Sequence, residues 1–209
     1  MDASQSLGQF LLAAVVISLT GVMLPGPMTA ATITKGYSEK HAGARIAAGH
    51  ALVEVPLIAV IAGIYFGTGN LISSPGVEKA IYLIGGLMLL YLGFRMFRAI
   101  GDAPGVVGGL PASSLLTGII ITGTNPGFYI WWATLGAVLV TGAARFGVVG
   151  VVLLTVVHLP CDVAWSEFLS VSTFESRRWW TKKTQRIVFG ICASILVGFG
   201  VWFCVSGFL

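Results

Sequence analysis

Residues 7–34 read LGQFLLAAVVISLTGVMLPGPMTAATIT, an apolar run that the sequence Pro-Gly-Pro interrupts at 25–27. A second apolar run, 113–141, is interrupted in the same way by Asn-Pro-Gly at 125–127. Proline removes a backbone donor and clashes with the preceding helical turn, and glycine adds conformational freedom. The pattern therefore predicts two broken helices at corresponding places in the two halves of the chain. The alternative is a pair of kinks that serve packing alone.

The composition is typical of a membrane protein. Of the 209 residues, 56% are hydrophobic and 10% are charged, whereas soluble domains carry about a quarter charged residues. The apolar residues fall into runs long enough to cross a bilayer, which takes about 20 residues. The expected spans are 7–34, 44–66, 79–99, 113–141, 146–170 and 186–208. Little chain is left over, so there is no room for a soluble catalytic domain. We expect one transmembrane domain over 1–209, with no enzymatic activity and no cofactor.

The basic residues are distributed unevenly along the chain. Ten of the twelve lie in the first, third and fifth connections between spans: Lys35, Lys40, Arg45, Arg95, Arg98, Arg177, Arg178, Lys182, Lys183 and Arg186. Because cytoplasmic loops carry the excess of Lys and Arg, these connections are predicted to face the cytoplasm of a plasma-membrane protein, with both termini outside. The net charge of +4 is then a topology signal within a lipid bilayer and does not indicate a nucleic-acid partner.

This topology relates the two halves of the chain to each other. Spans one to three start outside and end inside, and spans four to six do the reverse. The halves, about 1–105 and 106–209, are therefore predicted to be inverted repeats, as in many secondary transporters. The expected fold class is an all-α membrane protein with six spans, the first and fourth broken near mid-membrane. The segment 101–112 is expected to link the repeats, and a homo-oligomer is left open.

Each break is followed by a helix that carries a histidine and, four residues later, an acid. The pairs are His50 with Glu54 and His158 with Asp162. Residues four apart share one helix face. An acid deep in a bilayer is costly, so such residues usually face a bundle interior and serve ions, protons or substrates. Each pair can share a proton or bind a cation; the alternative is a structural pair that locks two helices together.

The candidate site combines these pairs with the residues at the breaks, where unwound carbonyls and half-helix N-termini can bind ions and carboxylates. The predicted proton- or cation-coupling residues are His50, Glu54, His158 and Asp162, with no dedicated metal site. The predicted substrate-binding residues are Pro25, Gly26, Pro27, Thr29, Thr124, Asn125, Pro126, Gly127 and Trp132. Glu167, five residues past Asp162, is expected to point elsewhere, and Glu175 is expected to be a solvated loop charge.

Two motifs, one in each half, are similar to those of a known family. The first is the Pro-Gly-Pro break, followed by Gly36, Gly43 and the segment from Gly49-His50 to Glu54. The second is the break at Thr124-Asn125-Pro126, followed by the aromatic residues Phe128, Tyr129, Trp131 and Trp132. Over nearly its whole length the chain resembles the lysine exporter (LysE/RhtB-type) family of amino-acid efflux transporters. The resemblance implies proton-driven export of an amino acid or a similar small solute.

Three functions compete for the same residues. The leading hypothesis is a secondary transporter that moves a small-molecule substrate by alternating access. The second is a divalent metal-cation exporter that uses the histidines and carboxylates as ligands, which suit transition metals. The third is a membrane oxidoreductase with paired cysteines, and the sequence argues against it. Cys161, Cys192 and Cys204 are isolated, and neither break contains a cysteine.

Overall fold

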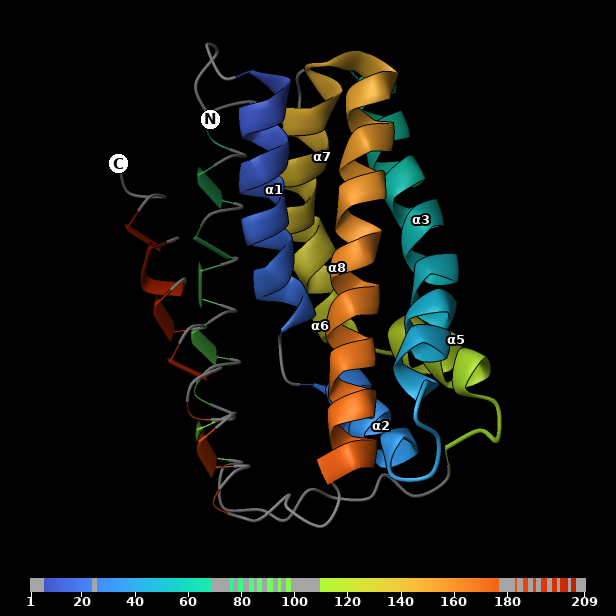
Figure 1. The fold of residues 1–209 in the computed structure, drawn as a ribbon. Coiled ribbons are helices and arrows are strands. Elements are labelled where there is room, and N and C mark those ends of the chain that lie inside the picture. The colour runs from blue at the N-terminus through green and yellow to red at the C-terminus, as the bar shows by residue number, and fades with distance from the viewer. Residues whose placement is uncertain are drawn as a thin grey trace.

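The structure, a computed structural model, describes residues 6–23, 26–68 and 110–176, together with scattered positions within 76–98 and 183–205. Every element in the described segments is helical (Figure 1). The elements are α1 (Leu7–Val22), α2 (Pro27–Gly36), α3 (Ala42–Thr68), α5 (Ser114–Gly123), α6 (Pro126–Trp131), the π-helical segment η1 (Trp132–Gly136), α7 (Ala137–Ala144) and α8 (Gly147–Ser176). The expected spans 79–99 and 186–208 and the expected linker 101–112 lie largely outside the described residues.

Helices begin and end at both predicted breaks. α1 and α2 meet at an angle of 75° across the first break. α2 starts at Pro27, a position where the missing N–H of proline costs no helical hydrogen bond. At the second break, α5 ends at Gly123 and α6 starts at Pro126. There the side-chain oxygen of Asn125 accepts a 3.0 Å hydrogen bond from the Gly127 amide. A proline in the first helical position thus restarts the chain at both places.

Among the described residues, three helical segments are long and apolar enough to cross a membrane, or four if α1 and α2 form one bent span. The three are Ala42–Gly67, Gly127–Ala144 and Gly147–Ser176. The prediction that Glu175 lies in a loop was wrong, because α8 continues to Ser176. The side chain of Glu175 is solvated as predicted, at 60% exposure, and pairs with Lys40 across 2.6 Å. The six-span count and the inverted repeats stay predictions.

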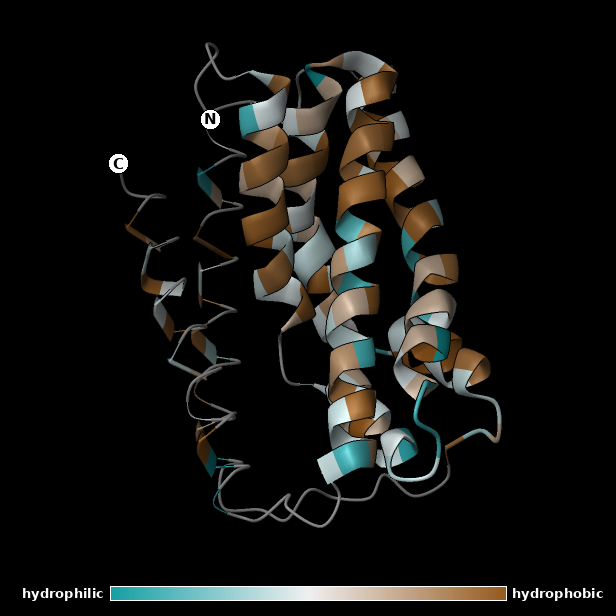
Figure 2. Cartoon of the chain, in the orientation of Figure 1, coloured by the Kyte–Doolittle hydropathy of each residue, from teal (hydrophilic) through white to brown (hydrophobic). Residues whose placement is uncertain are grey.

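The sides of the bundle are apolar. Large hydrophobic side chains are exposed along the helices that form these sides: Leu12, Val16, Leu52, Val60, Ile64, Val148, Val149, Val152, Val156 and Phe168. Figure 2 shows the same helices mainly in brown, with polar residues gathered near the turn between α2 and α3. Contiguous apolar surfaces of this extent are not typical of a soluble monomer, and they suit contact with lipid.

The basic residues of the described ranges 26–68 and 110–176 lie toward the two ends of this bundle. Lys35, Lys40 and Arg45 lie at or beside the turn between α2 and α3, which we call the basic end. Arg145 lies in the turn between α7 and α8, at the opposite end (Figure 1). This separation fits the topology predicted from the basic residues, and the assignment of the basic end to the cytoplasm stays a prediction.

α3 contacts α5 and α8 through its backbone near the basic end. A Cβ atom on Gly49 would lie 2.1 Å from a carbonyl oxygen of α5, and one on Gly43 would lie 2.0 Å from a carbonyl oxygen of α8. From the other side, a Cβ atom on Gly118 would lie 2.1 Å from the carbonyl oxygen of Ile46. Small residues permit this close approach of membrane helices. We call Gly43, Gly49 and Gly118 the glycine seam.

We expect Gly118→Ala to lower the midpoint of thermal unfolding in detergent by about 3–10 °C, because overpacking against backbone costs about 1–3 kcal/mol. Gly63→Ala in α3 is the matched control. A Cβ atom at Gly63 meets nothing within 4 Å in the described part of the chain, and alanine favours a helix over glycine. Midpoints that are equal for the two variants would contradict the close contact at the seam.

Candidate functional site

Four ionisable side chains from α3 and α8 meet inside the bundle. His50 and Glu54 lie one turn apart on α3, and His158 and Asp162 lie one turn apart on α8. All four residues are buried, with between 1% and 7% of their surface exposed. The spacing of four puts each pair on one helix face, and the packing of α3 against α8 brings the two pairs together. We call these four residues the acid–histidine cluster.

One oxygen atom of Glu54 lies at the centre of the cluster. Its Oε1 lies 3.0 Å from His50 Nε2 and 3.1 Å from His158 Nε2. The same oxygen accepts a 3.1 Å hydrogen bond from the indole N–H of Trp132. An ionised carboxylate only accepts hydrogen bonds, so both histidines carry a hydrogen on Nε2 when Glu54 is ionised. Three donors, from α3, α8 and η1, therefore converge on one acceptor.

The carboxylate of Asp162 has fewer hydrogen-bond partners than that of Glu54. Its Oδ1 lies 3.8 Å from His50 Nε2, and its Oδ2 lies 3.5 Å from His158 Nε2. Both distances are too long for a good hydrogen bond. Asp162 Oδ2 and Glu54 Oε2 are buried and have no hydrogen-bond partner in the described part of the chain. Because buried polar atoms are nearly always paired, these two oxygens are the atoms of the cluster that can accept a further ligand.

Each histidine also contacts a hydroxyl group on a broken helix. His50 Nδ1 lies 2.8 Å from Thr122 Oγ1 on α5, and His158 Nδ1 lies 2.7 Å from Ser18 Oγ on α1. The contacts cross between the halves of the chain, since α3 reaches the second broken helix and α8 reaches the first. A partner on Nδ1 fixes the ring and directs Nε2 toward the carboxylate. Each imidazole ring therefore links one broken helix to the Glu54 carboxylate.

The cluster faces a cavity of about 130 Å³ that is lined by the broken helices, α3 and α8. Ten of the predicted residues line it: Gly26, Pro27, Thr29, His50, Glu54, Asn125, Gly127, Trp132, His158 and Asp162. The starts of α2 and α6 therefore open onto the same space as the carboxylates. The described lining residues include no Lys and no Arg, so among these residues the positively polarised groups that could face a negative group are histidines and backbone amides.

Three predicted binding residues are not placed at the cavity. Thr124 is exposed, and its hydroxyl donates a 2.8 Å hydrogen bond to the Ile120 carbonyl. Hydroxyl groups of serine and threonine in helices often donate to a carbonyl of the preceding turn, so the placement of Thr124 gives no support for a role in binding. Pro25 and the side chain of Pro126 lie outside the described residues.

Two tryptophans pack against His158 in the wall of the site. The ring of Trp131 stacks on His158 with centroids 5.9 Å apart, and Trp132 meets it edge-on at 5.3 Å. Trp132 is 1% exposed, and a Cβ atom on Gly136 would lie 2.2 Å from its ring. The turn of π-helix that starts at Trp132 thus seats the indole where it can hold Glu54. The predicted contact of Trp132 with substrate stays a prediction.

Three hydroxyl residues of the site were missed by sequence reasoning. Ser18 and Thr122 contact the histidines, and Thr32 presents a buried hydroxyl that has no partner among the described residues and lies at the cavity. The only signal for them is a hydroxyl in an apolar run. That signal is weak, because most such hydroxyls bond to their own helix.

The negative charge of the cluster can be compensated in several ways. Two ionised carboxylates in one buried site are costly without a cation. A proton or an ammonium group can supply the charge. A metal ion can also supply it, because His50, Glu54 and Asp162 each offer one ligand atom and these atoms lie within 4.8 Å of one another.

Broken helices around a buried polar cavity, in a chain whose helices can cross a membrane, are the features of a membrane transport protein. A family model of the LysE type translocator matches residues 19–207, and the chain belongs to this family. No curated protein and no solved structure matches the chain. The family resemblance drawn from the two motifs is confirmed, and the function is therefore transport rather than catalysis.

Proposed function

We propose that the protein exports an amino acid or a similar small zwitterionic solute by alternating access, and that proton binding at the acid–histidine cluster drives the cycle. One observation supports this most directly. Glu54 Oε2 and Asp162 Oδ2 are buried without a hydrogen-bond partner in the described chain, and both residues line one cavity. The chain belongs to the LysE type translocator family, and the proposal adds a substrate class and a coupling ion.

The charge of the cluster depends on what it binds. With neutral imidazoles, two ionised carboxylates leave two negative charges in a buried site, and a bound cation relieves that cost. A proton and the ammonium group of a solute would compete for the same two oxygens. Replacement of one by the other on opposite sides of the membrane couples export of the solute to entry of the proton.

The carboxylate of a zwitterion fits the start of α2. Within the described chain no side chain caps this helix, whose N-cap is Gly26, whereas Asn125 caps α6. The positive end of a helix dipole favours a carboxylate. Thr32, on the same helix, adds a buried hydroxyl at the cavity. We therefore assign the carboxylate to α2 and the ammonium group to the cluster.

Counterflow in proteoliposomes tests the proposal. Vesicles are loaded with one of the twenty common amino acids, and uptake of the labelled form is followed with and without a pH gradient. We expect transient accumulation of at least one amino acid at a rate that changes with the gradient. If folded protein exchanges none of them, transport of amino acids is excluded.

Thr32→Val should weaken binding of a transported amino acid about tenfold, because it removes a hydrogen bond to a charged group. The decarboxylated amine of the same amino acid should bind equally well to both proteins. Competition in the counterflow assay measures both affinities. Thr155→Val is the control, since the hydroxyl of Thr155 bonds to its own helix at Val151 across 2.9 Å. An equal loss for the amine and the amino acid would contradict the assignment to α2.

A divalent-cation exporter is the second candidate, and the spacing of His50, Glu54 and Asp162 favours it. Imidazole and carboxylate ligands suit Mn²⁺, Co²⁺ and Zn²⁺. A ligand that binds only the folded protein raises its stability. A rise in the unfolding midpoint with Mn²⁺ or Zn²⁺, absent from Asp162→Asn and unmatched by any amino acid, would favour the cation over the amino acid.

We further propose the six-span topology in the plasma membrane with both termini outside. The basic end of the described bundle, with Lys35, Lys40 and Arg45, is then cytoplasmic. Alkaline phosphatase fused after Leu209 is active only outside the cytoplasm, so an inactive fusion would contradict this orientation.

A further inference from the structure

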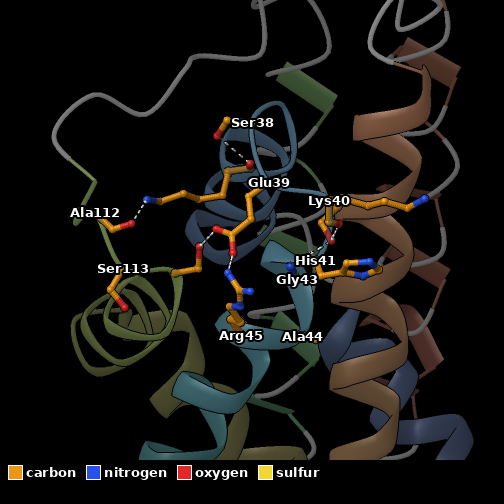
Figure 3. A network of polar contacts seen from close by, with 12 residues as sticks. Ser38, Glu39, Lys40, His41, Gly43, Ala44, Arg45, Ala112 and Ser113 are labelled. Atoms are coloured by element: carbon orange, nitrogen blue, oxygen red, sulfur yellow. Dashed lines mark hydrogen bonds and ion pairs between the residues drawn. The ribbon is translucent and has the colours of Figure 1, made fainter.

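The turn between α2 and α3 is bonded to α5 on one side (Figure 3). Glu39 accepts a 2.6 Å hydrogen bond from the Ser114 hydroxyl and pairs with Arg45. Beside it, Lys35 Nζ donates a 2.9 Å hydrogen bond to the carbonyl oxygen of Ala112. An acid and a base from the first half of the chain thus hold the start of α5, in the second half.

The other side of the turn is bonded to α8. Glu167 pairs with His41 and accepts a 2.9 Å hydrogen bond from the Ala44 amide. Ser170 Oγ accepts a 3.0 Å hydrogen bond from the Gly43 amide. Amides in the first turn of a helix have no partner within that helix. Two side chains of α8 therefore cap α3, which gives a structural role to Glu167, the acid expected to point away from Asp162.

These contacts lie next to the cavity on its basic side. Ser166 lines the cavity, and Glu167 follows it in α8. At the same level, a Cβ atom on Gly43 would lie 2.0 Å from the Ser166 carbonyl oxygen. Glu167 is five residues past Asp162, which is about 7.5 Å along a helix axis. Leu169 also lines the cavity, so the glycine seam and the polar contacts of Glu167 and Ser170 border the cavity at its basic end.

We propose that Glu39, Ser114, Glu167 and Ser170 form a gate between the cavity and the basic end, closed in this structure. The proposal rests on the alternating access proposed above, but not on the identity of the solute. Each of the four residues bonds across the two halves of the chain, which must separate at one end for a solute to enter.

The chemistry of these contacts suits repeated opening. Half-exposed ion pairs contribute little stability, and water can replace the side chains that cap α3. The glycine seam presents no interlocking side chains that would have to withdraw. Opening at this end therefore exchanges protein hydrogen bonds for water hydrogen bonds, and leaves the apolar core around Phe10, Leu139 and Leu154 intact.

Labelling of a cysteine in the cavity tests the gate. Cys161, Cys192 and Cys204 are replaced by serine, and Thr32→Cys supplies a thiol at the cavity. The same background with Lys40→Cys in place of Thr32→Cys marks which side of a vesicle carries the basic end, since the Lys40 side chain is 42% exposed. A thiol reagent that does not cross membranes is then added from that side.

We expect Glu39→Ala and Glu167→Ala to speed labelling of the Thr32→Cys thiol on the order of tenfold, through loss of ion pairs and a helix cap. Glu175→Ala is the control, because it removes an ion pair at the same end whose side chains are 42% and 60% exposed, and its labelling rate should not change. If the glutamate variants do not fold, Ser114→Ala and Ser170→Ala each remove one hydrogen bond of these contacts without removing a charge.

Unchanged labelling in the folded gate variants, or an equal rise in Glu175→Ala, would overturn the gate. The assay needs no solute, so its outcome is separate from that of counterflow. Faster labelling without exchange of any amino acid would retain the gate and reject the proposed solute class.

Discussion

Glu54→Gln is expected to abolish solute accumulation driven by a pH gradient, with a fall on the order of 100-fold in the driven rate. Glutamine cannot take up a proton, and a hydrogen bond to a charged group is worth about tenfold to a hundredfold. In the wild-type protein, Glu54 Oε1 accepts from His50, His158 and Trp132. Glutamine has nearly the same shape, but its amide neither carries a charge nor takes up a proton. Its amide oxygen can take the place of Oε1 and accept from the same three donors, but as a neutral acceptor it holds them less strongly than a carboxylate does.

The measurement is the initial rate of labelled solute flux in proteoliposomes after a pH jump, with folding checked by gel filtration. Glu175→Gln is the control, because it neutralises an exposed acid on α8 at the end of the bundle and should leave the flux unchanged. A Glu54→Gln protein that retains full response to the pH gradient would remove Glu54 from the coupling mechanism.

The breaks in the first and fourth apolar runs could be predicted because they follow from local chemistry. Pro27 and Pro126 each occupy the first helical position, where the missing N–H has no cost. No neighbouring segment is needed for that choice. The π-helical segment that starts at Trp132 had no such signal, since its sequence WATLG contains no proline and its turn depends on the position of the indole against Gly136.

The two acid–histidine pairs could be predicted from spacing, but the division of hydrogen bonds among them could not. Spacing of four shows that His50 and Glu54 share a face, and says nothing of the distance to α8. The structure places three donors on Glu54 and leaves an oxygen of Asp162 without a partner among the described residues. That inequality follows from the crossing of α3 and α8 and from the position of Trp132, both of which are tertiary.

The basic residues of the first connection were interpreted as a topology signal alone. The structure also gives two of them partners distant in sequence, since Lys40 pairs with Glu175 and Lys35 donates a hydrogen bond to the carbonyl oxygen of Ala112. A charge pattern shows an excess on one side of a membrane, but it does not show which acid, more than a hundred residues away, lies opposite. For that reason the proposed gate emerged only from the packing of α2 and α3 against α5 and α8.

Asp162→Asn should give a protein that is at least as stable as the wild type and does not couple transport to protons. Asp162 is 4% exposed, and its nearest contacts to the two histidines, at 3.5 and 3.8 Å, are long. A buried carboxylate without a good partner is costly to keep ionised, and asparagine removes that charge. We therefore expect the unfolding midpoint at neutral pH to stay the same or rise by about 2–10 °C.

The comparison with Glu54→Gln makes this prediction sharp, because both changes remove one buried carboxylate from the same cavity. Glu54→Gln replaces the charged acceptor of three hydrogen bonds by a neutral one and should lower the midpoint, whereas Asp162 accepts no hydrogen bond from the two histidines shorter than 3.5 Å. We expect the stability change to have opposite signs in the two variants, with coupling lost in both. That result would show that Glu54 stabilises the site, whereas the charge of Asp162 serves transport and not stability. A marked loss of stability in Asp162→Asn with transport intact would instead make Asp162 a structural residue, and the binding site would then have to be sought without it.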